Sequence, residues 1–214
     1  MSGPILVINP NSNAEVTAAM DRALDGFRRT GGPEIQCETL AEGPFGVESQ
    51  RDADSVVLPL VRRVDARPDA AAFIIACYSD PGLAACREAT SVPVFGIQEA
   101  GVLTALARGD RFGVIAIAEA SIRRHIAAMR RMGVLERCAG ERALGLTVAE
   151  SARGETFQRM EVVGRELIGD GADLLVLGCA GMARHRSPLE EALGRPVIDP
   201  VQAAVAMALG ACTD

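Results

Sequence analysis

The sequence predicts an α/β fold of two pseudo-symmetric lobes, each a mostly parallel four-stranded sheet flanked by helices, with a cleft between them. Short apolar runs alternate with helix-like stretches along the chain, which is the pattern of βαβ units. Most of these runs are continuous rather than alternating, as expected for strands buried on both faces. The 214 residues include six Phe, one Tyr and no Trp, so Ala, Val, Leu and Ile must fill the core.

Each predicted element follows from one apolar run or one periodic stretch, taken in order. The runs predict strands at residues 5–8, 34–39, 71–77, 92–96, 111–117, 142–147, 172–177 and 196–198. The stretch after the first strand has apolar residues at helical spacing, with Val16, Met20 and Leu24 on one face. Stretches of this kind predict helices at residues 13–29, 49–64, 82–90, 99–107, 121–132, 155–168, 188–193 and 200–209.

The second half of the chain repeats the order of the first. An apolar strand begins near Ile5 in one half and near Phe112 in the other, and each half later reaches a strand that leads to Cys77 or Cys179. Two lobes related in this way would place these strand ends on either side of a cleft, where open α/β sheets bind their ligands. The predicted lobes are residues 1–98 with 200–214, and residues 99–199.

Composition restricts the kind of partner. The net charge is −6 and no basic run is present, which argues against nucleic acid and favours a small-molecule substrate. No apolar stretch approaches the roughly 18 residues that a membrane span needs. The first residues lack the charged region and cleavage site of a signal peptide, so we expect a cytoplasmic protein with no membrane partner.

The sequence predicts no metal and no cofactor. Two His and six Cys without a C-x-x-C pair do not give the spacing of metal ligands. Neither a G-x-G-x-x-G motif nor a P-loop is present, so a nucleotide cofactor is not supported.

Two of the six cysteines are placed differently from the rest. Cys77 and Cys179 each follow an apolar strand and precede a turn into a predicted helix. Free backbone N–H groups and the positive dipole end of a helix start would stabilise a thiolate and lower its pKa from about 8.5. The others fit the common role of small buried hydrophobes: Cys37 in a strand, Cys86 in a helix, Cys138 in a loop and Cys212 in the tail.

Two facing thiols suit one kind of chemistry. Inversion of a carbon with an acidic hydrogen needs a base on one face and an acid on the other. A thiolate would remove the proton to leave a planar enolate, and the opposite thiol would return a proton from the other side. Backbone N–H groups at the two helix starts could hold the oxyanion.

The motifs around these cysteines resemble a known family. Residues 8–12 (Ile-Asn-Pro-Asn-Ser) resemble the N-terminal signature of the hydantoin and allantoin racemases, in the aspartate/glutamate racemase superfamily. Residues 76–83 (Ala-Cys-Tyr-Ser-Asp-Pro-Gly-Leu) and 177–182 (Leu-Gly-Cys-Ala-Gly-Met) are similar to the two cysteine motifs of that family. Residues 93–100 and 197–201 are similar to further family segments, so the matches cover nearly the whole chain in order.

The resemblance implies a cofactor-independent racemase that inverts an acidic C–H carbon of a 5-substituted hydantoin or an allantoin-like cyclic amide. Cys77 and Cys179 would be the acid/base pair of this 1,1-proton transfer, in a chain that forms a homo-oligomer. Substrate contacts would come from Asn11, Ser79 and the backbone at Ala180 and Gly181.

The chain also departs from the family pattern. Family members often have a Thr-Thr pair after the strand that opens the second half, where this chain has Ala116 and Ile117. One expected hydroxyl contact is therefore missing. Tyr78, beside Cys77, has two interpretations: a packing residue or a ligand contact.

Other polar candidates have plain structural explanations. His125 lies on a helix with Arg123, Arg124, Arg130 and Arg131, and we expect this face to be solvated. We also expect His185 to be exposed. Glu99 is favoured by the helix dipole alone and is a weak candidate. Residues 43–46 (Gly-Pro-Phe-Gly) are expected to form a surface loop, with a flap over the cleft as the alternative.

Four other functions stay open from the sequence. Aspartate or glutamate racemization and maleate isomerization can use two cysteines, but they need strong carboxylate binding, and no dedicated arginine is evident. Arylmalonate decarboxylation needs one cysteine, and the presence of two argues against it. A non-enzymatic two-lobed small-molecule binding protein is a further alternative, against which the placement of both thiols and the lack of a signal peptide weigh.

Overall fold

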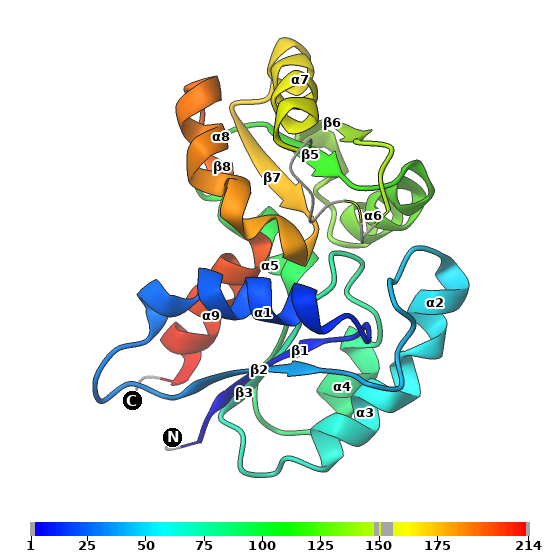
Figure 1. The fold of residues 1–214 in the computed structure, drawn as a ribbon, viewed down its shortest axis with the longest axis vertical. Coiled ribbons are helices and arrows are strands. Elements are labelled where there is room, and N and C mark those ends of the chain that lie inside the picture. The colour runs from blue at the N-terminus through cyan, green and yellow to red at the C-terminus, as the bar shows by residue number, and fades with distance from the viewer. Residues whose placement is uncertain (1–2, 148–149, 151–155, 213–214) are drawn as a thin grey trace.

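A computed structural model of the chain describes residues 3–147, 150 and 156–212. It contains two parallel four-stranded sheets with the same strand order, one in each lobe, as predicted (Figure 1). The first sheet has the order β2-β1-β3-β4, from β1 (Ile5–Asn9), β2 (Ile35–Thr39), β3 (Ala72–Ile75) and β4 (Val94–Gly96). The second has the order β6-β5-β7-β8, from β5 (Phe112–Ala116), β6 (Cys138–Ala143), β7 (Leu174–Gly178) and β8 (Val197–Ile198).

One predicted strand is misplaced. The sequence predicted a strand at residues 142–147, but β6 covers Cys138–Ala143, so Cys138 opens a strand rather than lying in a loop. Strand β6 is an edge strand that pairs only with β5 among the described strands, and its residues are only partly buried. A strand of that kind needs no continuous apolar run, and the leucines that suggested one, Leu144 and Leu146, follow it.

The helices lie where periodicity placed them, with shifted ends. They are α1 (Ala14–Ala23), α2 (Gln50–Ser55), α3 (Val57–Asp65), α4 (Leu83–Ala89), α5 (Ile97–Leu106), α6 (Glu119–Arg131), α7 (Thr156–Gly169), α8 (Arg186–Leu193) and α9 (Pro200–Cys212). The predicted helix 13–29 ends early and continues as a short 3-10 helix, Asp25–Phe27. The predicted helix 49–64 is divided at Val56 into α2 and α3. Glu155, the first residue of another predicted helix, lies outside the described residues.

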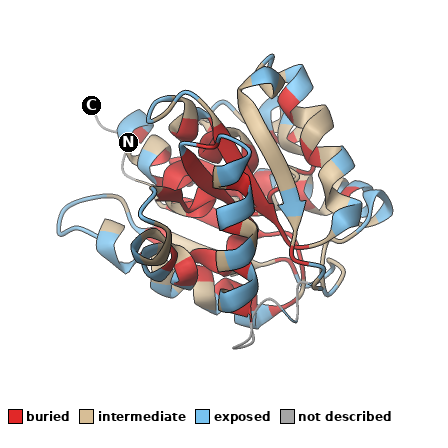
Figure 2. Ribbon diagram, turned by 90° about the horizontal axis from the view of Figure 1, so that it is seen from above, coloured by how far each residue is buried: buried red, intermediate tan, exposed pale blue. Residues whose placement is uncertain are grey.

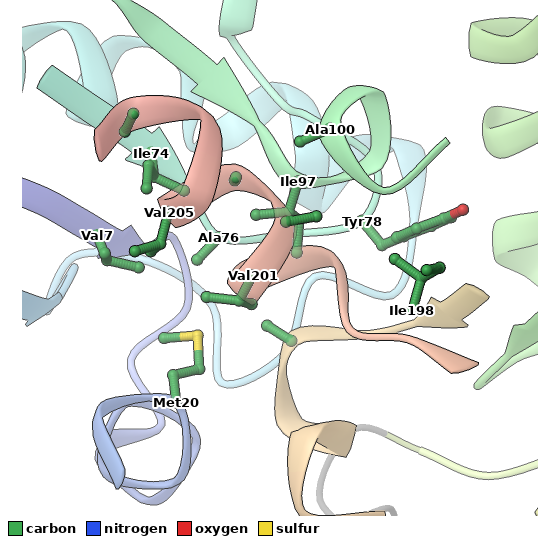
Figure 3. Packing of buried hydrophobic residues seen from close by; sticks show 14 of the residues in the cluster. Val7, Met20, Ile74, Ala76, Tyr78, Ile97, Ala100, Ile198, Val201 and Val205 are labelled. Atoms are coloured by element: carbon green, nitrogen blue, oxygen red, sulfur yellow. The ribbon is translucent and has the colours of Figure 1, made fainter. Parts of the chain in front are cut away.

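The two lobes share one hydrophobic core. Val201 and Val205 on α9 pack with Val7 and Ile74 of the first sheet (Figure 3), and the same cluster contains Val114 and other residues of the second sheet. Helix α5 packs against both α9 and β7, and α1 packs against the 3-10 helix η4 (Ala180–His185). Buried strands form the interior in Figure 2, with exposed helix faces outside. This packing fixes the position of one sheet relative to the other.

The register brings the functional segments to one edge of each sheet. Ile8 of β1 pairs with Ile75 of β3, so the chain after each strand emerges at the same carboxyl end. In the second sheet Ala116 of β5 pairs with Gly178 of β7. Among the described residues, no helix is long and apolar enough to cross a membrane.

Candidate active site

A pocket lies where the carboxyl ends of the two sheets meet. It encloses about 540 Å³ of free space, a volume that includes the open solvent at its mouth. Its walls come from both lobes, which is the arrangement expected from the repeat. The lining residues are Asn11, Val16, Val47, Glu48, Ala76, Cys77, Tyr78, Ser79, Ile117, Ala118, Ser121, His125, Gly178, Cys179 and Ala180.

Both cysteines and most predicted contact residues line this one pocket. Asn11, Tyr78, Ser79 and Ala180 join the thiols there. Gly181 does not line the pocket, but its backbone N–H forms a hydrogen bond to the thiol of Cys179. The residues predicted from the sequence are therefore brought together, and their roles in chemistry stay a prediction.

The environment of Cys77 differs from the expected one. Strand β3 ends at Ile75, and the turn of residues 78–82 separates Cys77 from α4, so this thiol does not lie at the start of that helix. Burial raises the pKa of Cys77 to about 12, and the backbone N–H of Ser79 only partly offsets this rise. The prediction of a lowered pKa was wrong because loss of water outweighs the N–H donors.

Cys179 follows β7 directly and stands at the start of the 3-10 helix η4. Burial raises the pKa of this thiol as well, while hydrogen bonds from the N–H groups of Gly181 and Ala180 lower it. The nearby Asp199 carboxylate raises it further. The charge of Cys179 also raises the pKa of Cys77, so the two sulfur atoms lie within electrostatic range of each other.

The turn after Cys77 is anchored by Asp80. Its two carboxylate oxygens accept hydrogen bonds from the backbone N–H groups of Gln98 and Glu99, each at 2.9 Å, at the start of α5. Asp80 has a φ of 44°, in the left-handed region that Asp and Asn tolerate better than most residues. The absence of a side chain at Gly96 makes room for it, because a Cβ there would lie 2.3 Å from the Asp80 carboxyl carbon. Burial raises the pKa of Asp80 to about 7.

The asparagine turn after β1 presents one amide to the pocket. Asn11 Oδ1 accepts hydrogen bonds from the Asn13 backbone N–H and from Asn9 Nδ2, both at 2.9 Å. Asn13 in turn caps α1 by accepting from the Glu15 N–H. Since Oδ1 is occupied, the Nδ2 group of Asn11 is the part available to a ligand.

Two expectations about histidines were wrong. His125 is 2% exposed, contacts the Glu141 carboxylate through Nδ1 and lines the pocket. His125 and Met129, one turn apart, form the buried face of α6. The expectation of a solvated helix came from its many Arg residues. His185 is also buried, at 8% exposed, and burial lowers its pKa to about 4. It does not line this pocket.

The arginines of α6 do not form a uniformly solvated face either. Arg124 is half-buried, and its Nε donates to Ser79 Oγ at 3.4 Å while Nη2 donates to the Glu48 carbonyl at 3.2 Å. Its charge lowers the pKa of Cys77. Arg124 therefore lies next to the site, although sequence alone gave no sign of it.

Several lining residues escaped the sequence analysis. Val47 and Glu48 follow the predicted 43–46 loop and cover part of the pocket, whereas Phe45 is exposed. Ile117 and Ala118, which follow β5, also line the pocket, and Ser121 supplies a hydroxyl in the first turn of α6. Glu99 is outside the pocket and pairs with Arg87 at 2.8 Å. In the described part of the chain, no cluster of three or more His, Cys, Asp or Glu could hold a metal ion.

The sequence and the fold resemble those of proteins of known classes. A family model described as Asp/Glu/hydantoin racemase matches residues 5–208. A hydantoin racemase of Paenarthrobacter aurescens is 33% identical over 213 residues, covering 95% of this chain and 89% of the relative. A hydantoin racemase of Rhizobium meliloti is 36% identical over 214 residues, covering 95% and 86%. The structure of an allantoin racemase from Klebsiella pneumoniae has a TM-score of 0.92 at 29% identity, covering 98% of this chain and 87% of that chain.

Two parallel sheets with a shared pocket at their carboxyl ends, together with these likenesses, define a two-lobed α/β isomerase. The chain belongs to the Asp/Glu/hydantoin racemase family, and it is a racemase.

Proposed function

We propose that this racemase inverts the acidic ring carbon of a 5-substituted hydantoin or an allantoin-like cyclic amide, without a cofactor, by proton transfer between Cys77 and Cys179. The observation that carries the proposal is that the two cysteines enter one pocket from equivalent strand ends of the two sheets. Relatives named hydantoin racemase and allantoin racemase support the substrate class.

The reaction needs one thiolate and one thiol. The thiolate takes the proton from the ring carbon, and the C–H electron pair moves into the adjacent carbonyl to give an enolate. The opposite thiol then protonates the carbon from the other face and becomes the thiolate. When the inverted product leaves, the cysteine that began as the thiolate is a thiol, and the other cysteine is the thiolate. The enzyme can then convert a molecule of the opposite enantiomer directly. To convert the same enantiomer again, the two cysteines must first exchange protons with water.

The pocket can bind a neutral ring with alternating N–H and carbonyl groups. The Asn11 amide, the Ser79 hydroxyl and the backbone of Ala180 line this pocket and would supply its polar contacts. Among the described residues, those lining the pocket include the acidic Glu48 but no Lys or Arg. This lining favours a neutral cyclic amide over aspartate, glutamate or maleate, whose carboxylates require a cationic partner.

The test is a polarimetric screen of enantiopure substrates. We expect 5-substituted hydantoins or allantoin to lose optical rotation without added cofactor, and aspartate and glutamate to keep theirs. The Cys37→Ser variant, altered at a half-buried thiol outside the pocket, is the matched control and should keep full activity. Racemization of amino acids but of no cyclic amide would contradict the assigned substrate class.

A further inference from the structure

A buried histidine–carboxylate pair forms part of the pocket wall and has no role in the two-thiol reaction. His125 comes from α6 and Glu141 from β6, and both side chains are only 2% exposed. Nδ1 of His125 contacts Oε1 of Glu141, and His125 is also one of the residues that line the pocket. The pair therefore connects the interior of the second lobe to the space where the substrate binds.

The contact with Glu141 determines the orientation of the two ring nitrogens of His125, Nδ1 and Nε2. A buried carboxylate is stable only when a donor or a positive charge compensates it. Oε2 of Glu141 has no hydrogen-bond partner among the described residues, so Nδ1–H of His125 is the donor that compensates this group. The hydrogen bond at Nδ1 fixes the orientation of the ring and leaves Nε2 for another partner.

Two further contacts hold the imidazole in place. The ring of Tyr78 meets it edge-on, with centroids 4.9 Å apart and planes at 84°. The Tyr78 side chain extends away from Val201 and Val205, with its hydroxyl at the far end (Figure 3). Buried Gln98 donates from Nε2 to the His125 backbone carbonyl at 3.0 Å. In the described part of the chain, the contacts of His125 include Nδ1 and the ring face but no hydrogen bond at Nε2.

We propose that His125 is a substrate-binding residue whose Nε2–H donates a hydrogen bond to a carbonyl oxygen of the cyclic amide, with Glu141 as its positioning residue. The inference rests on the proposed function and adds a donor that the cysteine motifs do not contain. That oxygen gains negative charge as the ring carbon loses its proton, so the hydrogen bond strengthens in the transition state.

Two substitutions distinguish the role of Nε2 of His125 from that of Nδ1. In His125→Gln the amide nitrogen takes the place of Nε2, and in His125→Asn it takes the place of Nδ1. We expect His125→Asn to lower kcat by roughly 100-fold or more, the usual effect of losing one oxyanion donor. His125→Gln should stay within about tenfold of the unmodified enzyme, since a donor is restored at the pocket. Equal loss in both variants with unchanged unfolding temperatures would contradict the assignment to Nε2.

The positioning role of Glu141 and the matched control are tested in the same assay. Glu141→Gln keeps an acceptor for Nδ1 but removes the charge, so it should lower kcat more than it raises KM. His185→Gln alters a second buried histidine, which lies outside the pocket, and should leave kcat within about twofold. A Glu141→Gln variant with unchanged kcat would overturn the positioning role.

Binding is observed directly in the unmodified chain. It contains only two histidines, so ¹⁵N-histidine labelling gives two imidazoles to assign. The ligand is a racemic 5-substituted hydantoin. Because a racemate is already at equilibrium, turnover does not change the proportion of the two enantiomers during the titration. We expect the Nε2 signal of His125 to shift and that of His185 to stay. Racemization with no shift at His125 overturns this inference and leaves the proposed function intact, whereas absence of racemization with any cyclic amide overturns the proposed function itself.

Discussion

Arg124 Nε donates a hydrogen bond to the Ser79 hydroxyl at 3.4 Å, and this contact joins helix α6 of the second lobe to the turn after Cys77. The same guanidinium donates to the carbonyl of Glu48, in the segment that covers the pocket. One side chain thus links both lobes and the covering segment. Its charge also lowers the pKa of Cys77, against the larger effect of burial.

Arg124→Gln should lower kcat/KM severalfold, because removal of the charge raises the pKa of Cys77 further and makes its thiolate scarcer. The equilibrium constant between enantiomers is one, so both directions must fall equally. Arg123→Gln, an exposed neighbour on the same helix, is the control and should keep full activity. Progress curves from each pure enantiomer measure the effect, and equal activity of the two variants would contradict it.

Asp80 should contribute to stability in a pH-dependent way. Its pKa is raised to about 7 in the folded state, above the value near 3.8 of an unperturbed Asp. The folded state therefore binds this proton more tightly, and the free energy of unfolding should fall as pH rises from about 4 to 7. Asp80→Asn removes that slope while an Asn tolerates the left-handed backbone.

Denaturant unfolding at several pH values between 4 and 7 tests this, with Asp69→Asn as the control. Asp69 is exposed, and its hydrogen bond with Arg67 lowers its pKa, so its contribution should not change above pH 4. Asp80→Ala should cost about 1–3 kcal/mol, the usual effect of losing two hydrogen bonds to a side chain that is mostly neutral in this pH range. A pH slope that persists in Asp80→Asn would show that another group causes it.

Alkylation of Cys77 should be slow at neutral pH. Only the thiolate reacts with iodoacetamide, and burial raises the pKa of this thiol to about 12. We expect the modification rate, followed by peptide mass spectrometry, to rise about tenfold per pH unit from pH 7 to 10. A reference peptide with an ordinary cysteine should level off near its pKa of about 8.5. A plateau for Cys77 at the pH of the peptide would contradict the raised pKa.

Local features of the sequence predicted most of the fold and the two thiols. Strands buried on both faces are continuous apolar runs, and Cys77 and Cys179 stand beside such runs, so both are visible without tertiary information. Strand β6 was misplaced because an edge strand has one sheet neighbour and needs few apolar residues.

The remaining site residues depend on contacts between distant elements. His125 pairs with Glu141 and Arg124 with Ser79, and neither pair shares an element or a motif. On a helix rich in Arg, only the tertiary structure shows which turn faces the pocket. The pKa values of the thiols were also beyond the sequence, since burial in a pocket wall outweighs the local N–H donors.

The most direct test of the two-thiol account is hydrogen exchange at the ring carbon in deuterated water, measured separately for each enantiomer in Cys77→Ser and Cys179→Ser. The account predicts folded variants that no longer racemize, each exchanging the hydrogen of one enantiomer only, with opposite enantiomers in the two variants. Full racemization by either variant, or exchange of the same enantiomer by both, would contradict it.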